Sequence, residues 1–331
     1  CSLISNIVPL EIPRMGGILP ATGQTESYNK FDDGFYLAGC NKGYTDNNDG
    51  TITDNCTGLM WIKHGLGLGA NNGTTTTWDN AIDFCNNLDF AGYTDWRLPN
   101  YKELFSIVDF GTQSAPVINK NYFGVKPDRY WTSSVWKEHR EYPGPVYYVY
   151  TIDFSNGKTY RVNIKDEPLT DFYILPVRGP DGPDVLPVTN TNQYRQGDDG
   201  DWQKGCNLEI QINEDGTKTD PCTNLMWQHV QLDGAYCSWE KAVEYAENSD
   251  FAGYRDWRLP NIQELLLTDS VRYRGLSHAW DYWSSTAYYF DNNQHWYLGN
   301  YVKRGETKTS NQNHFSFHWD IRLLFVRNID D

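Results

Sequence analysis

Apolar residues recur at helical spacing in two separate parts of the chain. The first run consists of Trp78, Ala81, Ile82, Cys85 and Leu88, and the second of Trp239, Ala242, Val243 and Ala246. A residue every three or four positions lies on one face of a helix. Thr77 and Ser238 precede the two runs and are suitable N-cap residues. The pattern predicts two amphipathic helices that begin near residues 78 and 239.

A second, shorter helix is expected after each of these. Pro99 and Pro260 cannot lie inside a helix, so each new helix begins behind its proline. The pairs with capping-box spacing are Asn100 with Glu103 and Asn261 with Glu264. Leucine and other apolar residues then continue one helical face at positions 104, 107 and 108, and at 265 and 266.

Short polar strands are expected before each helix pair, and a longer β-rich stretch after it. The tetrapeptides "NDGT" and "EDGT" are turn signals, while "GLMWI" and "NLMWQ" are typical of buried strands. Further on, "YWTSS" (130–134), the alternating "VYYVYTIDF" (146–154) and "YILPVR" (173–178) predict more strands. Each unit therefore belongs to the α+β class, with two short helices packed on a twisted, mostly antiparallel sheet.

The chain is duplicated. The segment "FAGYTDWRLPN" (90–100) recurs as "FAGYRDWRLPN" (251–261), and the similarity extends from "LPATG" and "LPVTN" to the closing "LPVRG" and "LFVRN". The period has the length of a whole domain rather than of a solenoid unit. A stretch rich in Pro, Gly and Asp at 179–185 is typical of a linker. The expected organisation is a tether at 1–18, a first domain at 19–179, a linker at 180–185 and a second domain at 186–331.

Composition narrows the classes of partner. The chain has 331 residues and a formal net charge of −15, which disfavours nucleic acid and bare anionic membranes because both reward clusters of Lys and Arg. Although hydrophobic residues make up only 39%, the 13 Trp and 23 Tyr can bury enough area for two cores. The sequence contains no run of about 18 apolar residues that would span a bilayer as a helix.

The repeated segment has two interpretations. A catalytic one would use the acid and arginine set Asp95, Arg97 and Glu103, repeated as Asp256, Arg258 and Glu264. A scaffold one places Trp96 and Trp257 in the core and has the arginines tie loops together by hydrogen bonds. We favour the scaffold, because both copies must fold. The sequence also lacks HExxH, GxSxG, P-loop and dinucleotide motifs, so a non-enzymatic protein is expected.

The cysteines suggest two equivalent disulfides. Cys40 and Cys56 are separated by the same 16 residues as Cys206 and Cys222, although six cysteines allow fifteen connectivities. The remaining Cys85 and Cys237 have no counterparts; they could pair across the repeats or within their own domains. No His and Cys spacing suggests zinc.

Oxygen-rich turns raise the question of calcium. The residues concerned are Asp46, Asn47, Asn48, Asp49 and Asp54 in the first copy and Asn213, Asp215 and Asp220 in the second. They fall short of an EF-hand, because position 12 would be Cys56 rather than Glu. Calcium is therefore one interpretation, and ordinary turn chemistry is the other.

Aromatic residues gather where the two copies differ most, between "YWTSS" or "YWSST" and the closing strand. The candidate ligand-binding residues are Trp136, Tyr147 and Tyr148 in the first copy and Tyr288, Tyr289, His295, Trp296 and Tyr297 in the second. Exposed aromatic rings serve sugar stacking and protein hot spots. Since side chains alternate along a strand, about half of them should instead fill a sheet core.

Several of these motifs together resemble the Lcl C-terminal domain family, named from a bacterial collagen-like adhesin. They are "LPATGQT", "DGTITDNCTGLMW", the helix with Trp, Ala and Cys, "GYTDWRLPN", "YWTSS" and the closing "VR", and they cover almost the whole chain twice. The resemblance implies two tandem C-type-lectin-like domains in a family of mostly extracellular binding modules, some of which bind glycosaminoglycan-like sugars. This chain departs from the family in lacking a cysteine in "PVRG" and "FVRN" and in its acidity, which disfavours a polyanionic ligand.

The beginning "CSLISN" resembles a mature bacterial lipoprotein; the alternative is an arbitrary starting point. On the first interpretation Cys1 carries a lipid and holds the protein in the bacterial cell envelope, on the extracellular face of the outer membrane, where disulfides persist. The expected function is recognition of a surface glycan or a surface or filament protein, with no nucleic-acid partner. The alternative is a structural lipoprotein subunit that coats or caps a larger surface assembly.

Overall fold

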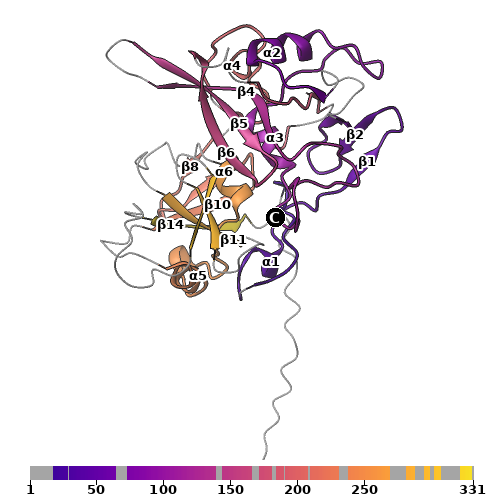
Figure 1. The fold of residues 1–331 in the computed structure, drawn as a ribbon. Helices are drawn as coiled ribbons and strands as arrows, with labels where there is room; N and C mark the ends of the chain where they lie inside the picture. Colours follow the sequence, from indigo (N-terminus) through magenta and orange to yellow (C-terminus); the bar gives the residue numbers. More distant parts are fainter. Residues whose placement is uncertain are drawn as a thin grey trace, which may run out of the picture.

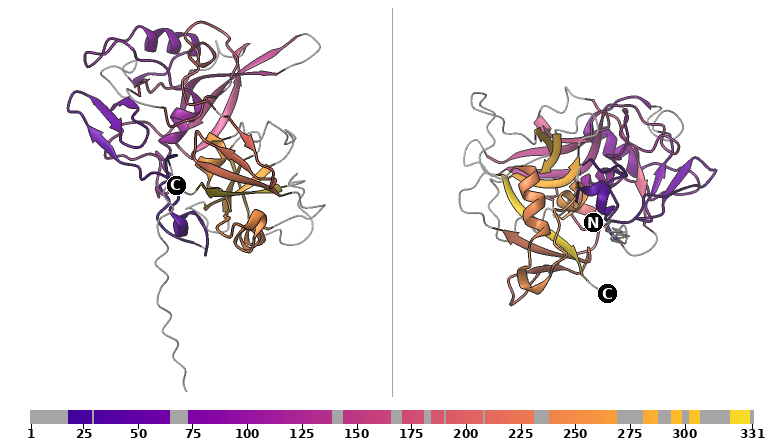
Figure 2. Two further views of the ribbon diagram at one scale, coloured as in Figure 1. Left: turned by 180° about the vertical axis from the view of Figure 1, so that it is seen from behind. Right: turned by 90° about the horizontal axis from the view of Figure 1, so that it is seen from below.

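The structure of the chain is a computed structural model (Figure 1). It describes residues 18–28, 30–64, 73–138, 144–165, 171–180, 184–189, 191–207, 209–230, 238–268, 281–287, 294–298, 302–306 and 321–329. The described residues form two mixed units of helix and sheet, as the duplicated pattern predicts, and Figure 1 and the left view of Figure 2 show them one above the other.

The first repeat contains two small sheets with two helices between them in sequence. Its four-stranded sheet has the order β1 (Tyr44–Asp46), β2 (Thr51–Asp54), β3 (Met60–Ile62) and β7 (Val177–Arg178), and its three-stranded sheet the order β4 (Arg129–Glu138), β5 (Val146–Asp153) and β6 (Lys158–Asn163). The helices are α2 (Trp78–Asn86) and α3 (Tyr101–Ser106). All the strands of these two sheets pair antiparallel.

The second repeat joins the corresponding strands into one sheet. Its order is β13 (Val302–Glu306), β12 (Gln294–Leu298), β11 (Asp281–Ala287), β14 (Ile321–Asn328), β10 (Leu225–Val230), β9 (Lys218–Asp220) and β8 (Gln211–Ile212). Only β11 and β14 pair parallel among these strands. The helical elements are α5 (Trp239–Glu247), the 3-10 turn η3 (Phe251–Gly253) and α6 (Ile262–Leu267).

Local chemistry sets where the helices begin. Thr77 and Ser238 cap α2 and α5, and their hydroxyls accept a hydrogen bond from the backbone N–H three residues later. Both α3 and α6 begin with a complete capping box, formed by Asn100 and Asn261 with the glutamate three residues on. The four predicted helix starts are confirmed.

Among the described residues, three apolar clusters form the core. Trp78, Trp96 and Trp131 belong to an outer cluster of the first repeat, and the corresponding tryptophans 239, 257 and 283 to an outer cluster of the second. A third cluster contains residues of both repeats, including the buried Trp61 and Trp227. Helices α3 and α6 contact one another in this shared region. The two repeats therefore bury one continuous interface, in addition to a core of their own.

The two N-terminal arms, defined as residues 19–40 and 186–206, pack on the opposite repeat. The first arm holds α1 (Asp33–Tyr36), which contacts β11, and the second holds α4 (Asp199–Trp202), which contacts β4. In Figure 1, α1 lies beside α5 and β11, whereas α4 lies beside α2 at the other end of the molecule. The sequence did not predict these helices or this exchange, because nothing in the local pattern says which domain receives an arm.

One carboxylate in each arm makes the crossing contact. Asp33 accepts hydrogen bonds from its own arm's Thr22 (2.6 Å) and from Thr286 of the second repeat (2.8 Å). Asp199 is bonded in the same way by Thr189 (2.5 Å) and by Ser134 of the first repeat (2.6 Å). The two exchanged arms are therefore equivalent.

The repeated tripeptide Asp-Asp-Gly in the arms follows from this geometry. The first aspartate, Asp32 or Asp198, caps the N-terminus of the short arm helix. The glycine follows the crossing carboxylate, and a Cβ on Gly34 would collide with the backbone of Glu26. Any larger residue would therefore push the arm open.

Burial of Asp33 makes arm docking sensitive to pH. Burial raises the pKa of the Asp33 carboxyl from 3.8 to about 7. The hydrogen bonds from Thr22 and Thr286 lower this pKa, and the nearby charges of Glu264 and Asp32 raise it by smaller amounts. Because the folded-state pKa is the higher one, this group's contribution to stability is complete below about pH 4 and is lost as the pH rises through about 7.

The replacement Asp33→Asn is expected to remove this loss, since the amide keeps an oxygen for both hydroxyls and carries no charge. Relative to the parent, the variant should gain free energy of unfolding between pH 4 and 8, by ~4 kcal/mol at most. Urea unfolding at several pH values measures the difference. The exposed Asp89→Asn serves as control, and parallel pH profiles for Asp33→Asn and the parent would contradict the prediction.

Candidate functional site

The repeated segment forms a buried ion pair in each copy. The Arg97 guanidinium donates two hydrogen bonds of 2.5 Å to the Glu103 carboxylate, and Arg258 donates two of 2.7 and 2.6 Å to Glu264. Both arginines are at most 5% exposed. Each glutamate also accepts the backbone N–H of its capping asparagine at 2.8 Å. Arginine and glutamate are thus occupied by one another and by the helix start.

Asp95 and Trp96, which recur in the second copy as Asp256 and Trp257, also hold the chain together. Asp95 pairs with Arg178 of β7 at 2.7 Å, as does Asp256 with Arg327 of β14. The Trp96 indole donates to the carbonyl of Phe90 at 3.1 Å, and Trp257 has the same bond in the second copy. Beside Glu103 the structure leaves a void of about 10 Å³, the size of one water. These contacts are those of the scaffold interpretation.

Both expected disulfides are present. Cys40 bonds Cys56 and Cys206 bonds Cys222, with a Cα–Cα separation of 5.9 Å in each. Each joins the end of an arm to the hairpin of its own repeat. Cys85 is a free, buried cysteine in the apolar face of α2. Cys237 lies outside the described residues, as do residues 1–17 of the predicted tether, Cys1 included.

The oxygen-rich turns bond to their own backbone. The Asp49 carboxylate accepts from the N–H and hydroxyl of Thr51, and Asp215 does the same for Thr217. Asp46 pairs with Lys63. Across the described part of the chain, no group of three or more His, Cys, Asp or Glu side chains is placed to hold a metal ion. The turn chemistry accounts for the contacts seen at these oxygens.

The first-copy aromatic candidates lie on both faces of the β4–β5–β6 sheet. Trp136 and Tyr148 are cross-strand partners and share a face, whereas Tyr147 pairs with Lys137 on the other. All three aromatic side chains are half-buried. The Trp136 ring lies 4.8 Å from the Arg161 guanidinium and packs against the shared core. The structure therefore separates Trp136 from Tyr147.

Tyr147 is joined by an aromatic residue that the sequence did not single out. Its ring lies 5.0 Å from that of Tyr194, which comes from the exchanged second arm and is 45% exposed. Tyr194 also approaches Trp78 of α2 at 6.1 Å. The Lys137 ammonium lies 5.8 Å from the Tyr147 ring. We call Tyr147, Tyr194 and Lys137 the aromatic surface.

A signal for Tyr194 exists in the sequence. In both arms a tyrosine, Tyr28 or Tyr194, stands four residues before the first aspartate of Asp-Asp-Gly. The sequence does not show which repeat the second arm packs on, so the contact between Tyr194 and Tyr147 could only be seen in the tertiary structure.

The candidates of the second copy are only partly described. His295, Trp296 and Tyr297 lie on β12, where they pair with Ala287 of β11, Arg304 of β13 and Trp283 of β11, respectively. Tyr288 and Tyr289 lie outside the described residues. In the segments that the structure describes, no helix is long and apolar enough to cross a bilayer.

Comparison with known proteins identifies the family. The Lcl C-terminal domain matches residues 50–178 and again residues 216–322. No curated protein and no solved structure matches the chain. The two matched segments span most of both repeats and contain both copies of the duplicated segment, so the chain belongs to the Lcl C-terminal domain family and carries two tandem copies of that domain.

Proposed function

We propose that the protein is a non-enzymatic recognition module of the bacterial cell surface, and that it binds a glycan or protein through the aromatic surface. The observation that carries this proposal is the pairing of the exposed Tyr194 with Tyr147 across the two repeats. An exposed tyrosine that packs beside a half-buried one and a cation is typical of sugar-stacking and protein-binding sites. The acid and arginine pairs of the duplicated segment support a role without catalysis, because they bond to one another.

The proposal includes a C-type-lectin-like fold for each copy and a place in the envelope. Family membership and the two disulfides support an extracellular module. A lipid on Cys1 would anchor it to the outer membrane. Mass spectrometry of the N-terminal peptide from native envelopes tests this part, and an unmodified Cys1 preceded by further residues would contradict it.

The binding proposal is tested with a glycan array, with and without calcium, beside a pull-down from native envelopes. Tyr147→Ala and Tyr194→Ala should each weaken capture of the bound glycan or protein by about 30-fold, because truncation of a central aromatic contact typically costs about 2 kcal/mol and ~1.4 kcal/mol corresponds to a factor of ten. Tyr245→Ala is the matched control, since Tyr245 is similarly exposed at 49% but lies on α5 of the other repeat.

The possible results separate two functions. Binding that Tyr147→Ala and Tyr194→Ala weaken and Tyr245→Ala preserves supports recognition at the aromatic surface. Equal binding by all variants would reject that surface. An empty array together with a single stoichiometric envelope protein would favour the alternative, a structural lipoprotein subunit of a larger assembly.

A further inference from the structure

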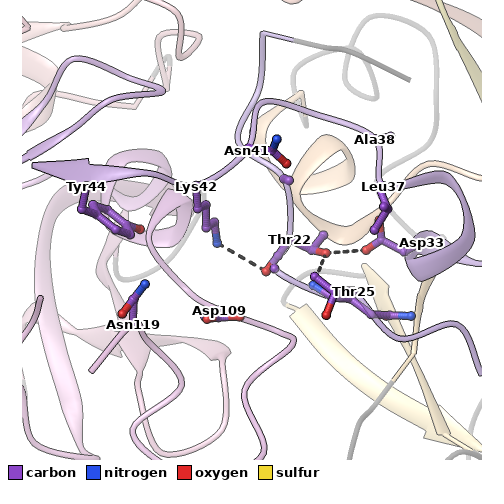
Figure 3. Close-up of a pocket in the computed structure, with 13 residues that line it drawn as sticks. Thr22, Thr25, Asp33, Leu37, Ala38, Asn41, Lys42, Tyr44, Asp109 and Asn119 are labelled. Carbon is purple, nitrogen blue, oxygen red and sulfur yellow. Dashed lines mark hydrogen bonds between the residues drawn. The ribbon is translucent and has the colours of Figure 1, made fainter. Parts of the chain in front are cut away.

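We propose a second binding site, in a polar pocket of the first repeat, for a neutral ligand that carries several hydroxyl groups, such as a sugar residue or a polyol. The pocket has a volume of about 410 Å³, within the range of small-molecule sites of roughly 300–1,000 Å³. Figure 3 shows Tyr44, Lys42, Asp109 and Asn119 toward one end and Asp33 at the other. The pocket is separate from the aromatic surface.

The Tyr44 hydroxyl is the observation that points to a ligand. Tyr44 is 7% exposed, lines the pocket, and its oxygen has no hydrogen-bond partner. Its ring is held at the edge of Phe123, 5.1 Å away, and beside Tyr122, 5.4 Å away, so the ring is fixed and the hydroxyl is directed to the pocket. A buried hydroxyl without a partner destabilises the fold, and a bound ligand that exchanges a hydrogen bond with it would offset this cost.

Lys42 places a cation in the same wall. Its ammonium donates to the carbonyl oxygens of Thr22 (3.4 Å) and Val108. Burial lowers the pKa of this amine to about 8, while Asp109, Asp54 and Asp33 act in the opposite direction. The lysine thus bridges the arm and the first repeat through these two carbonyls. An ammonium group has three N–H donors, so one donor remains for a ligand.

The second repeat shows that the fold does not require these polar groups. Counting from the equivalent Cys40 and Cys206, Lys42 corresponds to Leu208 and Tyr44 to Ile210. Ile210 packs against the shared apolar core. A duplicated scaffold therefore has an apolar solution at these two positions, and the first copy instead retains two costly polar ones.

The charges of the pocket select the ligand class. One ammonium is surrounded by the carboxylates of Asp33, Asp54 and Asp109, so a sulfated or otherwise anionic ligand gains no net attraction. A cation would meet the Lys42 ammonium. A ligand with hydroxyls can both accept from Lys42 and donate to Asp109, and it can exchange a hydrogen bond with Tyr44.

The test uses the full-length protein and defined probes: glucose, galactose, mannose, N-acetylglucosamine, maltose and inositol, with glycine and glutamate as zwitterions and heparin as an anion. Isothermal titration calorimetry measures the affinity of each probe. We expect at least one sugar or inositol to bind. Tyr44→Phe, which removes only the hydroxyl, should weaken that binding about tenfold, while the free energy of unfolding stays equal or rises.

Two further variants keep the result interpretable. The double replacement Lys42→Leu with Tyr44→Ile installs the residue types of the second repeat, and it should fold and lose binding. Tyr245→Phe is a control that should bind as the parent does. Unchanged affinity in Tyr44→Phe, preference for heparin or a zwitterion, or no binding of any hydroxyl-bearing probe would each overturn the proposal. Tyr147→Ala should leave probe affinity unchanged, so failure here is distinguishable from failure of the proposed function.

Discussion

A chain truncated after Pro180 is expected to dimerise by exchanging its arms. In the intact protein the second arm covers the first repeat: Asp199 accepts from Ser134, Lys102 donates to the Val188 carbonyl at 3.0 Å, and Arg195 pairs with Asp79 at 2.6 Å. Truncation removes these contacts and also deprives the first arm of its own receiver on the second repeat. Two truncated chains can restore both losses, because the two arms are chemically equivalent.

Light scattering after size exclusion measures the expected doubling of mass, and urea unfolding should depend on protein concentration. The matched variant Asp33→Lys in the truncated chain should prevent the exchange, since it replaces the carboxylate that meets the receiving hydroxyl. A truncated chain that is monomeric and as stable as the intact protein would show that each repeat folds by itself.

Replacement of Glu264 by Gln is expected to lower the free energy of unfolding by about 3–5 kcal/mol. Arg258 is 1% exposed, and its two short hydrogen bonds to the Glu264 carboxylate compensate its buried charge. The amide removes the counter-charge and one acceptor. The Glu264 Oε2 atom accepts both from Arg258 Nη1 and from the Asn261 N–H at 2.8 Å, so loss of the carboxylate weakens the start of α6 as well.

Chemical denaturation of the parent and variant gives this difference. Asp256→Asn is a matched control from the same segment: Asp256 also pairs with a buried arginine, Arg327, but its side chain is 41% exposed. The control should lose no more than about 1 kcal/mol. Equal losses in the two variants would mean that the buried pair has no special weight in the scaffold.

Much of each repeat could be predicted because its determinants are local. A proline followed by Asn-x-x-Glu specifies a helix start wherever the chain lies, and both capping boxes formed as expected. Equal cysteine spacing indicated two equivalent disulfides for the same reason, since each pair closes a short loop. The family was also recognisable, because its motifs occur twice in order.

The sequence by itself determined the duplicated elements, their helix starts and the disulfide pairs. It also determined that Trp96 and Trp257 of the repeated segment lie in the core. Only the tertiary structure decided which repeat receives each arm, and with it the meeting of Tyr194 with Tyr147 and the wall that Thr22 and Asp33 contribute to the pocket. The physical reason is that the receiving hydroxyls, Ser134 and Thr286, are interchangeable for an aspartate. Local chemistry therefore fits either repeat, and the choice depends on how the connected chain can bury both arms at once.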